Sequence, residues 1–265
     1  MTTEAQGLMQ AAAEVARKSG DVALEFFRQG VTVDIKKDGT PVTVADRTAE
    51  KTAREWIESH FPQDGILGEE FGETRPGARR RWILDPIDGT KTFIRGVPLW
   101  GTLVAVAEGE RILCGAAYFP PVGELLVAAP GGGCFWNDKP TRVSELADLS
   151  QALVLCTDER FQVHPDRGER WRTLAARSAI ARTWGDCYGY LLVATGRADV
   201  MVDELMSPWD AAALQPIIEE AGGVFTDWAG ARTAFGGNAI ATNAALASQV
   251  REILGAVSPA KAPQP

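Results

Sequence analysis

The 265-residue sequence has few of the residues on which several common enzyme mechanisms depend. It contains only two histidines, His60 near the end of a helical pattern and His164 within VHPD, and we expect both to lie at the surface. It has no GxSxG elbow, no GxxxxGK[ST] loop and no cysteine followed six positions later by arginine. These absences leave Ser-His-Asp, phosphohistidine and cysteine-phosphate schemes with little to work with.

Cysteine and long apolar runs are also scarce. The four cysteines form no CxxC pair and are scattered through apolar or mixed segments, which is typical of buried free thiols in a reducing compartment and argues against a structural zinc site. No segment reaches the roughly 18 apolar residues that a membrane helix needs, and the N-terminal MTTEAQGLMQ lacks a basic region followed by an apolar stretch. We therefore expect a cytoplasmic protein that does not bind membranes.

Positive charge is in deficit, with 27 Lys and Arg against 35 Asp and Glu and a net charge of −8. A surface of that sign argues against nucleic acid as a partner. It favours a site that meets anionic ligands through recruited cations, and a metal ion is the natural candidate. The hydrophobic fraction of 45% is that of an ordinary globular protein with one large core or two modest ones.

The chain changes style near its middle, and we predict an α/β protein with two domains. Residues 1–145 begin with two helical patterns, over 8–27 and 47–60, and continue with short apolar runs separated by Gly, Pro and Glu-Gly turns, as in an antiparallel meander. This N-terminal half is read as α+β. Residues 146–265 alternate strand-like and helical patterns and are read as a layered α/β unit, with SELADLSQ at the junction and SPAKAPQP as a tail.

Residues 82–93, WILDPIDGTKTF, contain an apolar run followed by two aspartates and a glycine, whose backbone no side chain covers. We predict that Trp82 to Asp85 form a buried strand and that Pro86, which has no N–H group, ends its ladder. Asp85 and Asp88 then converge across the turn, the Ile87 carbonyl is available, and free N–H groups follow. Carboxylates and a carbonyl suit a hard cation. The alternative is a plain D-G turn with an aspartate capping a helix.

Three other acidic stretches have the same character. Glu69 and Glu70 follow the apolar run in ILGEEFG, Asp210 is the third helical residue after Ser207 in SPWD, and Asp46 opens a helix in VTVAD. Each alone could be a solvated turn or a helix cap, and S-x-x-D is a capping-box spacing. All four stretches, however, lie where a strand ends or a helix begins, which is where loops gather side chains into one cleft.

WILDPIDGTKTF and WDAAALQPIIEEAGG, with GEE and VTVAD upstream, resemble the signatures of the inositol monophosphatase family of metal-dependent sugar phosphatases. The resemblance spans roughly residues 5–255. It implies a layered α-β-α-β-α fold, a homodimer, and two or three Mg²⁺ ions where the halves meet. A haloacid-dehalogenase-type phosphatase would instead need two aspartates one residue apart, and DPID places two residues between them.

The resemblance implies a division of the metal ligands. One Mg²⁺ would bind Glu69, Asp85 and the Ile87 carbonyl, and the second would bind Asp85, Asp88 and Asp210. Mg²⁺ prefers octahedral oxygen coordination and keeps several waters, so two or three protein oxygens per ion are enough. Two such ions can stabilise both the attacking and the leaving oxygen of an in-line displacement.

The resemblance also implies the remaining catalytic groups. The nucleophile is a water beside Glu69 and Thr90, with Asp46 supporting Thr90. The N–H groups of Gly89 and Thr90 hold the phosphate.

The substrate is implied by a subtler likeness. RTWGDCYGYLLVATGRADVMVDELMSPWD, residues 182–210, is similar to the branch of the family that hydrolyses histidinol phosphate, a small-molecule phosphate ester. The family pattern places Asp203 at the substrate's non-phosphate end and Asp186 on the same wall. The alternatives are that Asp186 caps a helix and that Asp203 and Glu204 form a solvated strand exit. Lys36, Lys37 and Glu70 remain unassigned.

Three other functions stay open. The chain could hydrolyse inositol 1-phosphate, or it could be a nucleotidase for 3'-phosphoadenosine phosphate. It could also be a catalytically silent relative that keeps the fold as a binding module. A silent relative would be expected to lose a metal ligand, and Glu69, Asp85, Asp88 and Asp210 are all present.

Overall fold

A computed structural model describes residues 2–36 and 39–256, so Lys37 and the predicted tail at 258–265 lie outside the described residues. The first half contains helices α1 (Thr3–Phe26), α2 (Val44–His60) and α3 (Thr90–Phe93), and strands β1 (Val33–Ile35), β2 (Pro41–Thr43), β3 (Gly65–Gly68), β4 (Gly72–Thr74), β5 (Arg81–Asp88), β6 (Gly101–Glu108), β7 (Arg111–Phe119), β8 (Glu124–Ala129), β9 (Gly133–Trp136) and β10 (Lys139–Thr141). Strands β3 to β10 form one sheet in the order β10-β9-β8-β7-β6-β5-β3-β4, mostly antiparallel.

The second half is built around a smaller sheet with the order β12-β11-β13-β15-β14. Its elements are β11 (Leu153–Cys156), α4 (Pro165–Arg177), β12 (Ile180–Arg182), α5 (Asp186–Ala194), β13 (Val200–Asp203), α6 (Pro208–Ala211), α7 (Leu214–Glu220), β14 (Val224–Thr226), β15 (Ala239–Thr242) and α8 (Ala247–Leu254). Strand β11 is parallel to β12 and β13, as the alternation of strands and helices predicts.

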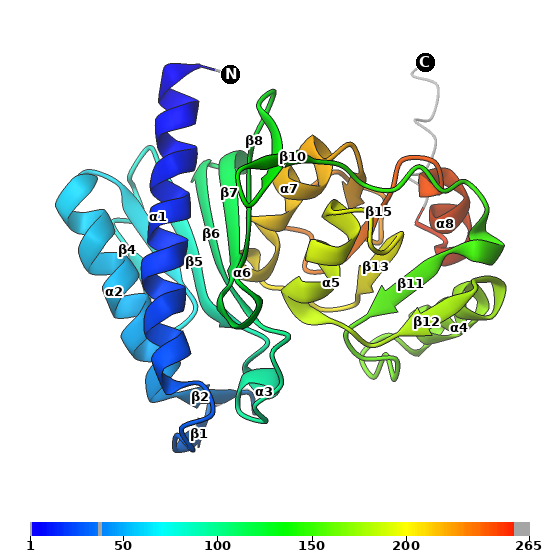
Figure 1. Ribbon diagram of the computed structural model, residues 1–265, viewed down its shortest axis with the longest axis horizontal. Helices are drawn as coiled ribbons and strands as arrows, with labels where there is room; N and C mark the ends of the chain where they lie inside the picture. Colours follow the sequence, from blue (N-terminus) through cyan, green and yellow to red (C-terminus); the bar gives the residue numbers. More distant parts are fainter. Residues whose placement is uncertain (1, 37–38, 257–265) are drawn as a thin grey trace, which may run out of the picture.

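The elements stack in five layers (Figure 1). Helices α1 and α2 bury apolar faces against the outer side of the large sheet. Helices α5 and α7 lie between the two sheets and contribute to a core that both sheets share. Helices α4 and α8 cover the far side of the small sheet. The predicted α-β-α-β-α fold is confirmed, and the two sheets meet around the middle helices.

The structure corrects the prediction that Pro86 ends its strand. Strand β5 continues through Pro86 to Asp88, and only its pairing with β6 shifts register between Asp85 and Asp88. An irregularity of this kind tolerates a residue without an N–H group. The Pro86 carbonyl accepts a hydrogen bond from Thr102 Oγ1 (2.8 Å), which fixes the irregular segment to β6.

Two helix boundaries also differ from the prediction. Helix α2 begins at Val44, three residues before the predicted start at 47, because Thr43 and Asp46 form a capping box. The helix after Ser207 is divided into α6 and α7. Pro216 has no N–H group to donate to the carbonyl four residues earlier, at the point where α6 ends.

The predicted burial of the cysteines and the predicted exposure of His60 are confirmed, whereas His164 is less exposed than predicted. All four cysteines are free and buried. His60 is exposed and stacks on Trp56, with ring centroids 4.0 Å apart, whereas His164 is half-buried before α4. Within the described residues, no helix has the length and apolar character to cross a membrane.

Candidate active site

The end of β5 holds two carboxylates in fixed positions. Asp85 is 2% exposed, and its Oδ1 accepts the Ile87 N–H (3.0 Å), which folds the carboxylate back over the irregular segment. Asp88 Oδ2 accepts the Cys187 N–H (2.7 Å) from the first turn of α5. One carboxylate is thus oriented by its own strand and the other by a helix of the second half.

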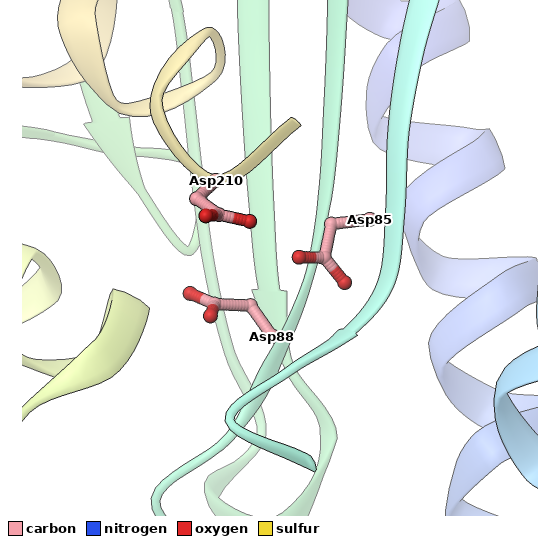
Figure 2. A group of neighbouring side chains, drawn as sticks. All are labelled: Asp85, Asp88 and Asp210. Carbon is pink, nitrogen blue, oxygen red and sulfur yellow. The ribbon is translucent and has the colours of Figure 1, made fainter. Parts of the chain in front are cut away.

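Asp210 completes an acidic cluster from the opposite side. Its Oδ2 accepts the Ser207 N–H (2.7 Å) in a capping box at the start of α6, with Pro208 at the first helical position as predicted. Oxygen atoms of Asp85, Asp88 and Asp210 lie within 4.8 Å of one another (Figure 2). The capping bond uses only one of the two Asp210 oxygens, so a capping role and a ligand role are compatible.

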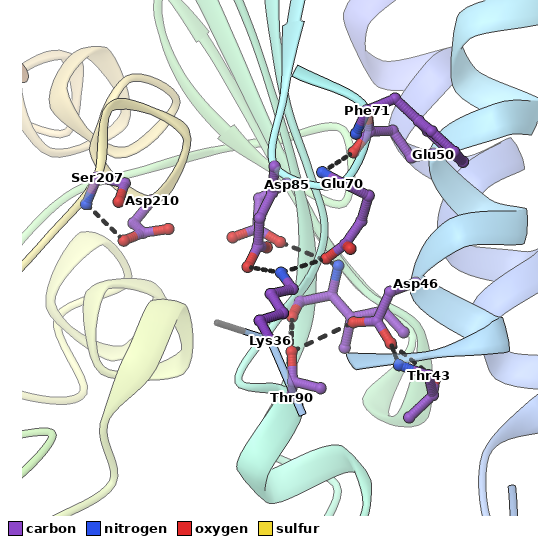
Figure 3. Close-up of polar contacts among 12 residues, drawn as sticks. Lys36, Thr43, Asp46, Glu50, Glu70, Phe71, Asp85, Thr90, Ser207 and Asp210 are labelled. Carbon is purple, nitrogen blue, oxygen red and sulfur yellow. Dashed lines mark hydrogen bonds and ion pairs between the residues drawn. The ribbon is translucent and has the colours of Figure 1, made fainter. Parts of the chain in front are cut away.

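Glu69 and Glu70 lie in the turn between β3 and β4, beside this cluster. The Lys36 ammonium donates to Oε1 of Glu69 (2.7 Å) and to Oε1 of Glu70 (2.6 Å). Figure 3 shows Lys36 beside Glu70. Glu69 is outside the group of three aspartates that share the 4.8 Å limit. Two of the three residues that the sequence left unassigned, Lys36 and Glu70, therefore form an ion-paired group with Glu69.

Thr90 connects the turn after β5 to α2. Its Oγ1 lies 3.2 Å from Asp46 Oδ1 and 3.0 Å from the Ile87 carbonyl oxygen. Asp46 is fully buried, and its other oxygen accepts from Thr43 N–H and Oγ1, both at 2.7 Å. Gly89 precedes α3 with φ of +92°, and the N–H groups at the start of a helix have no acceptor within that helix. Asp46 is both a cap and a partner of Thr90.

The carboxylates repel one another in the absence of a cation. Burial, followed by the charge of Glu69, raises the pKa of Asp85 well above its ordinary value. Burial, followed by the charge of Asp186, does the same to the pKa of Asp88. Burial raises the pKa of Asp210 to about 6 and that of Glu70 to about 7. The donors are oxygen atoms only, in a buried group with excess negative charge, and this donor set fits Mg²⁺.

A pocket of about 420 Å³ opens beside the cluster. On one side it is lined by the candidate metal and phosphate residues Glu69, Asp88, Gly89, Thr90 and Asp210. Residues of the second half line the other side, and they include Asp158, Phe161, Asp186, Asp203, Glu204 and Met206. A larger hollow of about 810 Å³, between the start of α1 and α7, holds none of the predicted site residues.

Asp186 and Asp203 both line this pocket, in different surroundings. Asp186 is the first residue of α5 at φ of +50°, and its Oδ2 lies 3.3 Å from Thr92 Oγ1, close to the phosphate turn. Asp203 is 7% exposed and accepts from Tyr190 OH (3.0 Å) and the Thr157 N–H (3.3 Å). Burial raises the pKa of Asp203 to about 8. A solvated strand exit does not describe Asp203.

Glu204 has a different partner from its neighbour. Its two carboxylate oxygens accept the N–H groups of Val163 (3.4 Å) and His164 (3.0 Å). Those groups belong to the segment that leads into α4, and Val163 lines the pocket. Asp203 and Glu204 together attach the loop at 157–164 to the end of β13.

Sequence reasoning missed several residues that hold these groups. Cys187 orients Asp88 through its backbone, Tyr190 covers Asp203, and Glu50 binds the turn that carries Glu69. No local pattern identifies the first two, because each acts across the gap between distant segments. Glu50 had one signal, a carboxylate on the apolar face of α2, at helical spacing from Ala53 and Ile57.

Known proteins share this arrangement of elements. Residues 4–258 match the inositol monophosphatase family. A histidinol-phosphatase from Chlorobaculum parvum is 45% identical over 88% of this chain and 90% of its own, and one from Mycobacterium tuberculosis is 38% identical over 92% and 95%. A solved inositol monophosphatase from Zymomonas mobilis superposes with a TM-score of 0.85 at 33% identity, covering 96% of this chain and 100% of its own. The chain belongs to the inositol monophosphatase family of phosphatases.

Proposed function

We propose that this protein is a magnesium-dependent phosphatase that hydrolyses histidinol phosphate. The observation that carries the proposal is a pocket lined by Asp88 and Asp210 of the oxygen-only cluster and, in addition, by the acidic residues Asp158, Asp186, Asp203 and Glu204. The cluster suits the metal ions that bind a phosphate. This acidic wall suits the cationic amine and imidazole at the other end of the substrate. The names of the two histidinol-phosphatases reported above support the same assignment.

The metal ligands follow from the geometry and the resemblance together. Glu69, Asp85 and the Ile87 carbonyl would hold one Mg²⁺, and Asp85, Asp88 and Asp210 would hold another. When bound, the ions supply positive charge that draws in the phosphate oxygens and lowers the pKa of the attacking water. The Lys36 ammonium donates to Glu69 Oε1 and therefore competes with a cation for that oxygen.

The remaining groups orient the attacking water and hold the phosphate. The Thr90 hydroxyl, which donates to Asp46, would present a lone pair that accepts a hydrogen bond from the attacking water, with Glu69 beside that water. The N–H groups of Gly89 and Thr90 bind the phosphate at the start of α3. No protein nucleophile takes part, and the buried free cysteines are spectators.

The negative wall accounts for the choice of alcohol. Asp186 lies nearer the phosphate turn, through Thr92, and Asp203 lies deeper, under Tyr190. A cyclitol such as inositol needs only hydroxyl partners, whereas histidinol carries positive charge. We propose in addition that the enzyme is a cytoplasmic homodimer with domains at 1–145 and 146–265. The free cysteines and the family resemblance support this.

The test is phosphate release from four esters at saturating Mg²⁺: histidinol phosphate, inositol 1-phosphate, fructose 1,6-bisphosphate and 3'-phosphoadenosine phosphate. We expect the highest kcat/KM for histidinol phosphate and no hydrolysis after chelation. Faster hydrolysis of inositol 1-phosphate would replace this proposal with the inositol monophosphatase assignment. Absence of hydrolysis of every ester would favour a binding module.

A further inference from the structure

Glu50 of α2 is a fully buried carboxylate that the proposed mechanism does not use. Its Oε2 accepts the N–H of Glu70 (2.7 Å), and its Oε1 accepts the N–H of Phe71 (3.2 Å). Figure 3 shows Glu50 reaching from α2 to the turn that carries Glu70. The preceding amide, of Glu69, donates to the Leu84 carbonyl of β5 (3.2 Å). Three successive N–H groups of the turn are therefore fixed.

Arg54 fixes the carboxylate in turn. Its Nε donates to Glu50 Oε1 (2.7 Å), and its Nη1 donates to Thr74 Oγ1 (2.6 Å) on β4. Its Nη2 donates to the Gly72 carbonyl. The pair thus spans the whole turn, from its amides to the strand that follows.

The packing leaves no freedom for this carboxylate to move. A Cβ atom at Gly68, the last residue of β3, would lie 2.0 Å from Glu50 Oε1 and 2.4 Å from its carboxyl carbon. The glycine before Glu69 therefore makes room for the Glu50 carboxylate under the turn.

We propose that Glu50 is a positioning residue for the first metal site, holding the backbone of Glu69 and Glu70 so that the Glu69 carboxylate stands beside Asp85. The inference rests on the proposed role of Glu69 as a metal ligand. Removal of a group that orients a metal ligand typically weakens metal affinity 10- to 100-fold. Within the part of the chain that the structure describes, the Glu50 carboxylate is hydrogen-bonded to the turn and to Arg54 and not to Asp88 or Asp210, so we expect its effect to fall on the first ion.

Asp64 provides a matched control, because it is a buried carboxylate with the same kind of partners at another place. It is 6% exposed and accepts from Arg80 Nε (2.6 Å) and Trp82 Nε1 (2.9 Å), and it does not line the pocket. Glu50→Gln and Asp64→Asn each convert a buried, arginine-paired carboxylate into an amide. Both substitutions are expected to destabilise the fold, whereas only Glu50→Gln is expected to disturb the position of a metal ligand.

The experiment is calorimetric titration of Mg²⁺ into the metal-free full-length proteins, with amide hydrogen exchange on the same samples. We expect Glu50→Gln to weaken the binding of one ion 10- to 100-fold and to speed exchange at Glu70 and Phe71, while Asp64→Asn binds as the parent does. Arg54→Gln, at the half-exposed end of the pair, should show a smaller loss in the same direction and is the fallback if Glu50→Gln does not fold.

The outcomes separate the two proposals. If the parent and both amide variants bind Mg²⁺ equally, the positioning role of Glu50 is wrong and the proposed function stands. Equal weakening in Glu50→Gln and Asp64→Asn would show that the effect is general destabilisation, which also overturns the role. A parent protein that binds no Mg²⁺ would instead overturn the metal-dependent function itself.

Discussion

At the scale of single residues, several acidic side chains have two duties that the sequence presents as rivals. Asp210 caps α6 through one oxygen and stands in the aspartate cluster, and Asp46 caps α2 while accepting from Thr90. A capping bond restricts the rotamer of a short side chain, and a restricted carboxylate loses less entropy when it binds a cation. Caps at the site therefore help to preorganise it.

Replacement of Asp85 by asparagine and replacement of Asp210 by asparagine should have different effects, because Asp85 is the proposed ligand to both ions and Asp210 is both a ligand and a helix cap. Asp85→Asn should abolish phosphate release, because the shared ligand to both proposed ions is lost. Asp210→Asn should weaken Mg²⁺ binding and turnover and cost about 1 kcal/mol of folding stability through the cap. Mg²⁺ titration beside urea unfolding measures both effects. An Asp210→Asn protein with normal turnover and only the stability loss would show that the residue is a cap alone.

Asp203 leads to an expectation that depends on pH. Because burial raises the pKa of its carboxyl to about 8, Asp203 is mostly protonated in the free enzyme at pH 6.5 and mostly ionised at pH 9. An ionised carboxylate bonded to a cationic substrate is worth roughly 1.5 to 3 kcal/mol, or about tenfold to a hundredfold. Asp203→Asn should therefore leave the KM for histidinol phosphate nearly unchanged at pH 6.5 and raise it about tenfold at pH 9.

Inositol 1-phosphate is the control for that measurement, since it is uncharged at the end that faces Asp203. Its KM should respond little to Asp203→Asn at either pH. A tenfold rise for both esters, or a rise that is the same at both pH values, would mean that Asp203 acts only through the loop that it attaches at Thr157.

At the scale of elements, local patterns predict most of the fold. The apolar spacing along 8–27 and 47–60 indicates the two helices that cover the large sheet, and the short apolar runs between turns indicate its meander. The failures have local physical causes. Strand β5 passes through Pro86 because the pairing shifts there, and Pro216 divides the last predicted helix. Neither effect can be read from apolar periodicity.

The candidate site also has a part that the sequence predicts and a part that it does not. Strand ends, helix starts and the family resemblance together predict that three aspartates are neighbours. The structure confirms that oxygen atoms of Asp85, Asp88 and Asp210 lie within 4.8 Å of one another. Sequence patterns do not identify the residues that orient the acidic side chains. Cys187 orients Asp88 through its backbone amide, and Tyr190 contacts Asp203, which is 13 residues away in sequence. Residues that hold a ligand in place follow from packing between elements, which sequence spacing does not encode.

Gly89 joins β5 to α3, and its backbone provides a test at this scale. Its φ is +92°, and a Cβ there would lie 3.2 Å from Asp186 Oδ2 and from the Leu99 carbonyl oxygen. Gly89→Ala should cost about 1 to 2 kcal/mol for the left-handed backbone. It should also lower turnover at least tenfold, because the phosphate turn must shift. Urea unfolding and phosphate release measure the two effects.

Gly123 supplies the matched variant. It has φ of +65°, nothing lies within 4 Å of a Cβ built there, and it does not line the pocket. Gly123→Ala should carry a similar backbone cost with turnover unchanged. Equal turnover in Gly89→Ala and Gly123→Ala would contradict a phosphate-binding role for the turn.

At the scale of the whole molecule, the cluster couples folding to cation binding. Strand β5 of the large sheet supplies Asp85 and Asp88, and the segment after the small sheet's β13 supplies Asp210, so like charges meet where the two halves join. Without a cation, that repulsion opposes the packing of α5, α6 and α7 between the sheets. A bound cation, such as the proposed Mg²⁺, would replace the repulsion with attraction.

The sign of the resulting pH dependence follows from the raised pKa values. Asp210, at about 6, and Glu70, at about 7, hold protons in the folded metal-free protein that the unfolded chain releases near pH 4. The stability that these two groups contribute to the metal-free protein is therefore fully present below about pH 4 and is lost as pH rises through about 6 to 7. Mg²⁺ at 100 times its Kd adds about 2.7 kcal/mol, or roughly 5 °C or more in Tm. We expect that gain in full at pH 8 and a smaller one at pH 6, where protons compete for the carboxylates. Thermal unfolding with Mg²⁺ or a chelator at both values measures it, and the doubly substituted Asp85→Asn, Asp210→Asn protein should lose most of the gain while keeping the part of the pH dependence that Glu70 contributes. An equal or larger gain at pH 6 would mean that the acidic cluster is not where the ion binds.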